Sequence, residues 1–159
     1  MWGISMKDKI IRHYLPLFLI GATTYCTIEV WFRGYSYRLM SIIGGICFLI
    51  IAYLKEILPW ESPILLQMFV SAEIVTLLEA ISGNFALQVL GIRMWDYSNM
   101  WMPAFNNFIC PLFSFLWFLL SAVAIVLSDS IRYYWIHDGS RPRYYIFGHA
   151  IKLPQRTCC

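Results

Sequence analysis

Four apolar runs, each close to the length that crosses a bilayer, constrain this chain more than any other feature. A helix rises about 1.5 Å per residue, so about 20 residues cover a hydrocarbon core about 30 Å thick. Lipid offers the backbone no hydrogen-bond partners, so such runs cross as helices. The runs are Tyr14 to Phe32, Leu39 to Leu58, Pro63 to Ile81 and Phe108 to Leu127. The sequence therefore predicts an all-α, polytopic membrane protein built as a bundle of four transmembrane helices.

The composition excludes a soluble fold of this length. Of the 159 residues, 60% are hydrophobic and only 13% are charged, whereas a soluble domain carries about 25% charged residues. We expect a multi-pass integral protein of the cell membrane, with residues 1–130 forming the transmembrane domain. Residues 131–159 are expected to form a short basic and aromatic cytoplasmic tail, because this segment is too short to make a core of its own.

The basic residues predict the orientation of the chain. Four crossings place both termini on one side, and that side collects nine of the twelve Lys and Arg residues, against three on the other. Short loops rich in Lys and Arg stay in the cytoplasm, so both termini are predicted to be cytoplasmic. The net charge of +3 then belongs mainly to ends that touch lipid headgroups, and nucleic-acid binding is not implied.

Three glutamates, Glu29, Glu73 and Glu79, lie inside the apolar runs. A charge at the centre of a bilayer costs on the order of 3 kcal/mol or more, so such residues usually face a partner, a cavity or a ligand. Glu29 and Glu79 are expected near the outer boundary, and Glu73 about 9 Å deeper. Two alternatives remain open for Glu29 and Glu79: a ligand, ion or proton site, or a structural carboxylate bonded to neighbouring helices. Glu73 is a candidate for a protonation role.

The connection from Ser82 to Asn107 is long and rich in aromatic and polar residues. It is too long for a simple turn, and its aromatic rings favour the headgroup region. We expect an outer cap that folds over the ends of the first and third helices and completes a polar pocket around two of the glutamates. The predicted ligand-binding residues are Glu29, Glu73, Glu79, Asn84, Trp95, Asp96 and Asn106. Trp95 has an alternative role as an interfacial anchor.

The cysteines and histidines do not predict a metal or redox site. No Cys-x-x-Cys pair or Cys/His spacing of metal-ligand type occurs, and no Ser-His-Asp set can be assembled. Cys26, Cys47 and Cys110 are expected to pack inside the bundle, and Cys158 and Cys159 are expected to be free thiols. We therefore expect no metal, no cofactor and no enzymatic activity.

Several of these residues form a pattern that resembles a known family. The pattern is Glu29 near Trp31, Glu79 followed by Gly83-Asn84, then Trp95-Asp96-Tyr97-Ser98, Phe105-Asn106 and Trp117. It is similar to the ABC-transporter type IV family of small, mostly bacterial membrane proteins, over roughly residues 15 to 130. The family tends to have a glycine shortly after the asparagine, whereas this chain continues Asn107-Phe108-Ile109-Cys110-Pro111. The resemblance implies a permease or transporter subunit.

A permease of this kind would depend on other subunits. The 159 residues contain no Gly-x-x-x-x-Gly-Lys-[Ser/Thr] phosphate loop, so ATP hydrolysis would need a separate ATPase. Four helices would also have to form a homo-oligomer or join a partner to enclose a translocation path.

Three hypotheses follow from the sequence. The chain is a transport component that binds a small polar or cationic solute in an outward-facing acidic pocket. Alternatively, it is a scaffold or sensor that binds other proteins through the outer loop and the tail. The third hypothesis is an intramembrane enzyme with Glu79 and Asp96 as an acid/base pair, which no nucleophile or cofactor motif accompanies. The tail itself is expected to rest on the inner leaflet, or else to dock a cytosolic partner.

Overall fold

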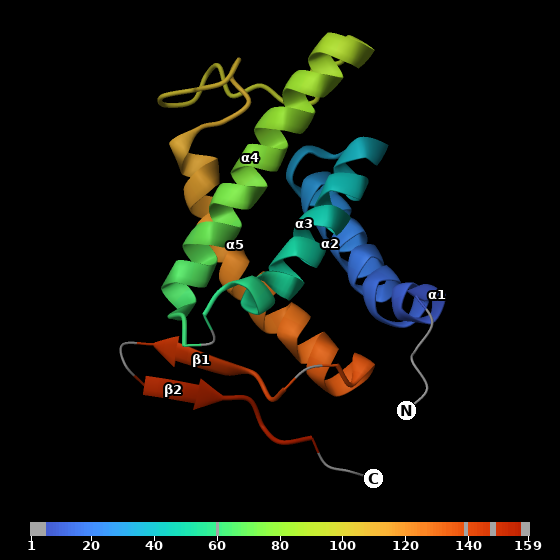
Figure 1. The fold of residues 1–159 in the computed structure, drawn as a ribbon. Coiled ribbons are helices and arrows are strands. Elements are labelled where there is room, and N and C mark those ends of the chain that lie inside the picture. Colours follow the sequence, from blue (N-terminus) through green and yellow to red (C-terminus); the bar gives the residue numbers. More distant parts are fainter. Residues whose placement is uncertain (1–5, 60, 139, 147–148, 157–159) are drawn as a thin grey trace.

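The structure is a computed structural model that describes residues 6–59, 61–138, 140–146 and 149–156. Four long helices form a bundle, and a two-stranded antiparallel hairpin lies across one end of it (Figure 1). The elements are α1 (Met6–Lys9), the π-helical η1 (Ile10–Tyr14), α2 (Leu15–Arg33), α3 (Arg38–Ile57), α4 (Ile64–Leu90), α5 (Pro111–Ser130), the π-helical η2 (Ile131–Ile136), β1 (Arg143–Ile146) and β2 (His149–Lys152).

The predicted bundle of four membrane-spanning helices is confirmed in length and composition. Within the described residues, four helical segments are long and apolar enough to cross a membrane. They are Ile10–Arg33, Arg38–Ile57, Ile64–Leu90 and Pro111–Ile136. The chain is therefore a multi-pass membrane protein.

The third helix is longer than the sequence predicted. We expected it to end at Ile81 and a connection to begin at Ser82, but α4 continues to Leu90 and its C-cap is Gly91, which adopts a left-handed conformation with φ of 67°. Gly83 does not end the helix. Its role is to make room for an aromatic ring, since a Cβ atom there would lie 2.6 Å from the side chain of Phe108. The connecting segment between α4 and α5 is thus residues 91–110, hereafter the 91–110 segment.

Glycines allow α2 and α3 to approach closely. A Cβ atom on Gly21 would lie 2.3 Å from Cβ of Phe48, and one on Gly44 would lie 2.4 Å from Cβ of Tyr25. Gly45 meets the ring of Phe18 at 2.5 Å in the same way. Small residues at a helix crossing permit the backbone approach that drives helix association in lipid. This contact fixes α2 on α3.

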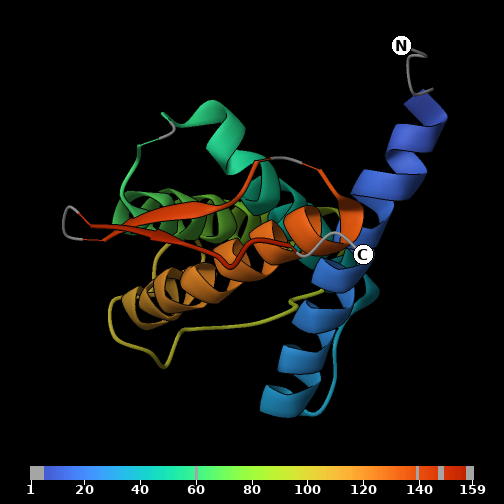
Figure 2. The same cartoon turned by 90° about the horizontal axis from the view of Figure 1, so that it is seen from below.

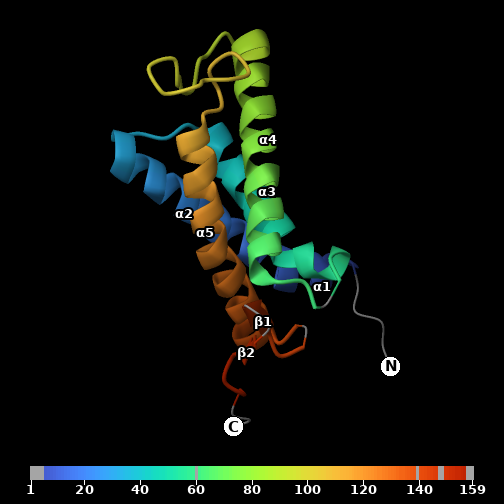
Figure 3. The same ribbon diagram turned by 90° about the vertical axis from the view of Figure 1, so that its left-hand side faces the viewer.

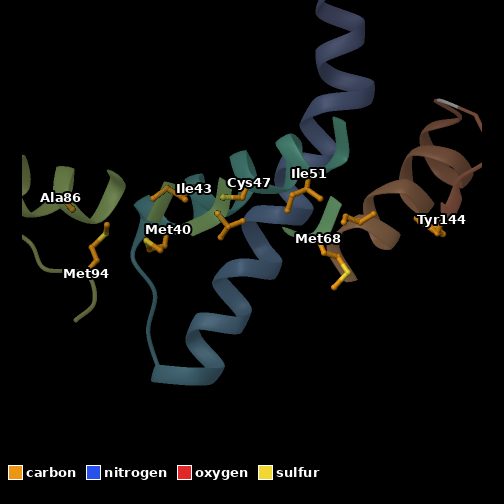
Figure 4. Close-up of a cluster of buried hydrophobic side chains, with 10 residues drawn as sticks. Met40, Ile43, Cys47, Ile51, Met68, Ala86, Met94 and Tyr144 are labelled. Atoms are coloured by element: carbon orange, nitrogen blue, oxygen red, sulfur yellow. The ribbon is translucent and has the colours of Figure 1, made fainter. Parts of the chain in front are cut away.

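Helix α2 leans away from α4 and α5 toward its end at Arg33 (Figures 2 and 3). The main hydrophobic core lies instead along α3, between it and the helices α4 and α5. Figure 4 shows this core running the length of the bundle, from Ala86 and Met94 at one end, past Cys47, to Met68 and Tyr144 at the other. The arrangement leaves space between the C-terminal half of α2 and α5, and the candidate site lies there.

The hairpin was not predicted. Residues 131–159 were expected to form a tail on the membrane surface, but β1 and β2 pair with Tyr144 opposite Ile151, and Tyr145 forms a bridge to Pro63 at the start of α4. Tyr144 is buried, and its hydroxyl donates a hydrogen bond to Asp129 of α5 at 2.9 Å. The Lys55 ammonium, which pairs with Asp129, lies 4.1 Å from the centre of the Tyr144 ring. Cys158 and Cys159 lie outside the described residues.

The glycine contact generates a prediction for the α2–α3 crossing. We expect Gly44→Val to lower the free energy of unfolding by about 1–3 kcal/mol, because the added methyl groups collide with Tyr25. The midpoint of SDS-induced unfolding in mixed micelles measures this change. The control is Ile46→Val, two residues along at a site that is 40% exposed. Equal midpoints for the two variants would contradict the close crossing.

The contacts of Tyr144 generate a second prediction. We expect Tyr144→Phe to lower the free energy of unfolding by about 1 kcal/mol through loss of the hydrogen bond to Asp129. Amide hydrogen exchange in β1 and β2 should become faster. Tyr35→Phe is the control, because Tyr35 is exposed and its hydroxyl has no hydrogen bond to the described residues. Unchanged exchange in the hairpin would show that Tyr144 does not hold it.

Candidate functional site

The carboxylate of Glu79 joins three helices. Its side chain is buried in α4, with 4% of the residue exposed. The hydroxyl of Tyr25 on α2 donates to Oε1 at 3.0 Å, and the indole Nε1 of Trp117 on α5 donates to Oε2 at 2.8 Å. The two rings stack, with centroids 5.7 Å apart and planes 16° apart. Both carboxylate oxygens therefore have a donor.

A pocket of about 670 Å³ opens beside this carboxylate. It lies between α2, α5 and the 91–110 segment, at the end of the bundle opposite the hairpin (Figure 3). Eight of its eighteen lining residues are aromatic: Tyr25, Trp31, Phe32, Tyr35, Trp95, Tyr97, Phe113 and Trp117. Its charged lining residues are Glu29, Arg33, Glu79, Arg93 and Asp96. A pocket of this size with aromatic walls suits a small organic molecule.

The charges in the pocket are not equally available. Arg33 forms an ion pair with Glu29 one turn earlier on α2, and Ser36 also donates to Glu29. Arg93 lies 3.4 Å from Asp96. Two of the three carboxylates thus have a cationic partner. Within the part of the chain that the structure describes, Glu79 has no cationic partner.

The 91–110 segment is held against α2 and α5. Arg33 donates to the backbone carbonyl of Met94 at 2.7 Å. Trp95 donates to the carbonyl of Phe108 at 3.1 Å, which closes the segment on itself. The ring of Tyr97 stacks on Phe113 of α5, with centroids 4.5 Å apart. These contacts place the Trp95, Asp96 and Tyr97 side chains along the pocket.

Tyr97 contributes a neutral hydroxyl to the pocket. Burial raises the pKa of this phenol well above its ordinary value, and the negative charge of Glu79 raises the pKa further. The group therefore keeps its proton at neutral pH and remains available as a hydrogen-bond donor.

The structure brings four of the seven predicted site residues to the pocket: Glu29, Glu79, Trp95 and Asp96. Asn84 and Asn106 do not line it, because Asn106 donates to Asn84 at 2.7 Å and Asn84 donates to its own helix at Ala80. Glu73 is exposed on another face of α4. A ligand-binding role stays a prediction for all seven residues.

The sequence analysis missed the two donors to Glu79 and the arginines of the pocket. Tyr25 could have been found, because it lies four residues before Glu29 and so shares its helix face. The same spacing links Glu29 to Arg33. Trp117 appeared with Glu79 in the family pattern, but no spacing linked the two, since a tryptophan inside a span is ordinarily a lipid or core residue. Among the described residues, no group of three or more His, Cys, Asp or Glu side chains is placed to hold a metal ion.

Comparison with known proteins supplies a family for this chain. The family described as "Putative ABC-transporter type IV" matches residues 14–150, which cover all four long helices and reach into the hairpin. No curated protein and no solved structure matches the chain. The match and the four apolar helices together indicate a membrane transporter component. The chain belongs to the ABC-transporter type IV family.

Proposed function

We propose that this protein is the solute-binding membrane subunit of a transporter and that its solute is a small organic cation. The observation that carries the proposal is Glu79, a buried carboxylate with no cationic partner among the described residues, at the wall of an aromatic pocket. The Lys and Arg distribution predicts that the pocket faces outward. A solute from outside then meets the pocket first.

The aromatic walls favour an organic cation over a metal ion. The negative faces of Trp and Tyr rings attract an ammonium group within about 6 Å, most strongly where water is excluded. Metal ions prefer several oxygen ligands, whereas both oxygens of Glu79 accept hydrogen bonds from Tyr25 and Trp117. An ammonium group can approach the same carboxylate as a third donor, because each oxygen carries more than one lone pair.

The scaffold or sensor alternative draws on the surface of the 91–110 segment. Trp101 is 76% exposed, and Met102 and Phe105 are also exposed. Met102, Phe105, Asn106 and Asn107 all have positive φ, between 50° and 65°. Such strain in non-glycine residues clusters at functional sites. Under this alternative the segment binds another protein, and the pocket holds no solute.

Transport by a four-helix chain further requires neighbouring subunits. The position of Glu73 favours a contact with one such subunit. It is exposed nine residues into α4, about 14 Å from the start of the helix and so near the bilayer midplane. A carboxylate facing lipid there is costly. In a dimer whose two-fold axis is parallel to the membrane normal, the two Glu73 side chains meet at equal depth and face each other instead of lipid. We therefore propose a second copy of this chain on this face of α4.

The solute proposal predicts a selective effect of Glu79→Gln. We expect amines and quaternary ammonium compounds to raise the melting temperature of the wild-type protein in detergent. Glu79→Gln should need a ligand concentration at least about tenfold higher for the same rise in melting temperature, because the ion pair between the carboxylate and the cation is lost. The matched control is Glu73→Gln, the same substitution on the same helix away from the pocket, which should bind normally.

The same experiment can contradict the solute proposal. If no cation stabilises the wild type, and Glu79→Gln only lowers the melting temperature, Glu79 is a structural carboxylate. That result favours the scaffold or sensor alternative. If Glu73→Gln loses binding to the same extent as Glu79→Gln, the cation does not bind at the Glu79 carboxylate in particular, and the solute proposal is wrong.

The dimer proposal predicts different outcomes for two substitutions of Glu73. Glu73→Gln should keep the association, because amide side chains also hydrogen-bond across membrane helices. Glu73→Leu should yield monomers that fold normally, since leucine is stable in lipid. The mass of the detergent complex, determined by light scattering, shows whether the chain is a monomer or a dimer. Energy transfer between labelled copies in nanodiscs tests the same association in a bilayer. A dimer that persists in Glu73→Leu, or a monomeric wild type, would overturn the proposal.

A further inference from the structure

A second pocket of about 360 Å³ lies at the other end of the bundle, beside the hairpin. The last turns of α3 and α5, the beginning of α4 and the chain that leads into β1 surround it (Figure 1). The residues that carry the argument are Lys55, Gln67, Asp129, Arg132, Arg141 and Arg143, all in its wall. The proposed solute site does not use any of them.

The acidic groups of this pocket are already paired. Lys55 forms an ion pair with Asp129. Arg132 binds Glu56 at 2.6 Å and Asp138 at 3.1 Å. Burial opposes ionisation of Asp138, but the hydrogen bond and the charge of Arg132 outweigh it and lower the pKa of this carboxyl. All three carboxylates in the wall thus serve as counterions for Lys55 and Arg132.

Two arginines remain without an acidic partner among the described residues. Arg141 donates its Nε to the backbone carbonyl of Leu153, which leaves the outer edge of its guanidinium without a described partner. Arg143, the first residue of β1, is exposed. Only Pro142 separates the two arginines in the chain. The pocket wall contains four cationic and three acidic side chains, so its net charge is positive. Guanidinium groups without an acidic partner suit phosphate oxygens.

Gln67 adds a polar atom that lacks a partner. The residue is 3% exposed in the first turn of α4 and lies in the pocket wall. Its Nε2 donates to the carbonyl of Ser62 at 2.9 Å, so the amide orientation is set by that bond. Its carbonyl oxygen Oε1 has no hydrogen-bond partner in the described part of the chain. A buried acceptor without a donor is costly. Oε1 has almost no accessible surface, so a donor on a ligand would satisfy it once the Gln67 side chain turns toward the pocket.

We propose that this pocket binds a phosphate ester that carries a hydroxyl or ammonium donor beside the phosphate. Arg141 and Arg143 bind the phosphate oxygens, and the Gln67 side-chain carbonyl accepts a hydrogen bond from the donor. Lys55 and Arg132 are balanced by the three carboxylates, so Arg141 and Arg143 supply the net positive charge of the site. The bound ester joins the hairpin to α4, because its two ends contact one element each.

Two sources supply this chemistry: the headgroup of a phospholipid, or a soluble phosphate ester. The pocket lies where the membrane spans end, at the depth of the headgroups, and anionic headgroups are attracted to basic residues there. Phosphatidylglycerol carries both the phosphate and the hydroxyl donors. Glycerol 3-phosphate carries the same groups in soluble form.

The test is the melting temperature of the full chain in nanodiscs of phosphatidylcholine alone or with phosphatidylglycerol. A third sample contains phosphatidylcholine with glycerol 3-phosphate in solution. Phosphatidylcholine has a phosphate but no hydroxyl or ammonium donor in its headgroup, so it is the reference. We expect the wild type to melt at a higher temperature in at least one of the samples with phosphatidylglycerol or glycerol 3-phosphate, and the increase should be reduced to half or less in Arg143→Gln. A fourth sample contains phosphatidylcholine with phosphatidic acid, whose headgroup lacks the glycerol hydroxyls. The wild type should be stabilised more by phosphatidylglycerol than by phosphatidic acid, and Gln67→Met should lose this preference. The matched control is Lys152→Gln, which removes a charge directly opposite Arg143 in the hairpin but lies outside the pocket.

Each outcome bears on the proposal. An increase that Arg143→Gln abolishes and Lys152→Gln retains supports it, and the sample that shows the increase identifies the source as lipid or soluble ester. An equal reduction in both variants would overturn it, because the hairpin would then be attracted to the surface by general charge alone. No increase in any sample would also overturn it. Hydrogen exchange in β1 confirms that each variant keeps the hairpin folded.

Discussion

The placement of a single carboxylate governs the upper half of this bundle. Leaving Glu79 charged in hydrocarbon would cost on the order of 3 kcal/mol or more, and hydrogen bonds to a charged group contribute about 1.5–3 kcal/mol each. The donors come from two other helices, Tyr25 on α2 and Trp117 on α5. Satisfying Glu79 therefore fixes the rotation of three helices about their axes. The pocket exists because these three helices are held at this one point.

The position of α2 follows from a second constraint, the contact of small residues with α3. Gly21 and Gly44 bring the two backbones together, so α2 follows α3 and leans away from α5 above Tyr25. The space that opens is bordered by aromatic rings and closed by Tyr97 and its neighbours from the 91–110 segment. Close packing on one side of α2 thus produces a cavity on the other side. The family assignment adds the functional context of a transporter component.

The sequence predicts the crossings well, because the energetics of lipid leave few choices for a long apolar run. It predicts helix ends less well: Gly83 and Asn84 look like a turn, but the glycine accommodates Phe108 and the asparagine bonds back to Ala80. Partners across helices depend on rotation and tilt, which no spacing within one helix reveals. This is why Asn84 and Asn106 bind each other and why Trp117 was not foreseen as a donor. The hairpin escaped prediction because its stability comes from Tyr144 and its contacts with Asp129 and Lys55, which lie far away in sequence.

The ion pairs at the hairpin end also have a consequence for the order of events during synthesis. Lys55 and Asp129 are separated by 74 residues, and Glu56 and Arg132 by 76. When α3 enters the membrane, Lys55 and Glu56 have neither of these partners yet and can compensate only each other. Their partners arrive together on one turn of the last crossing helix, and Tyr144 follows fifteen residues after Asp129. A chain that stalls before α5 therefore displays a lysine and a glutamate without their final partners, which distinguishes it from a finished protein.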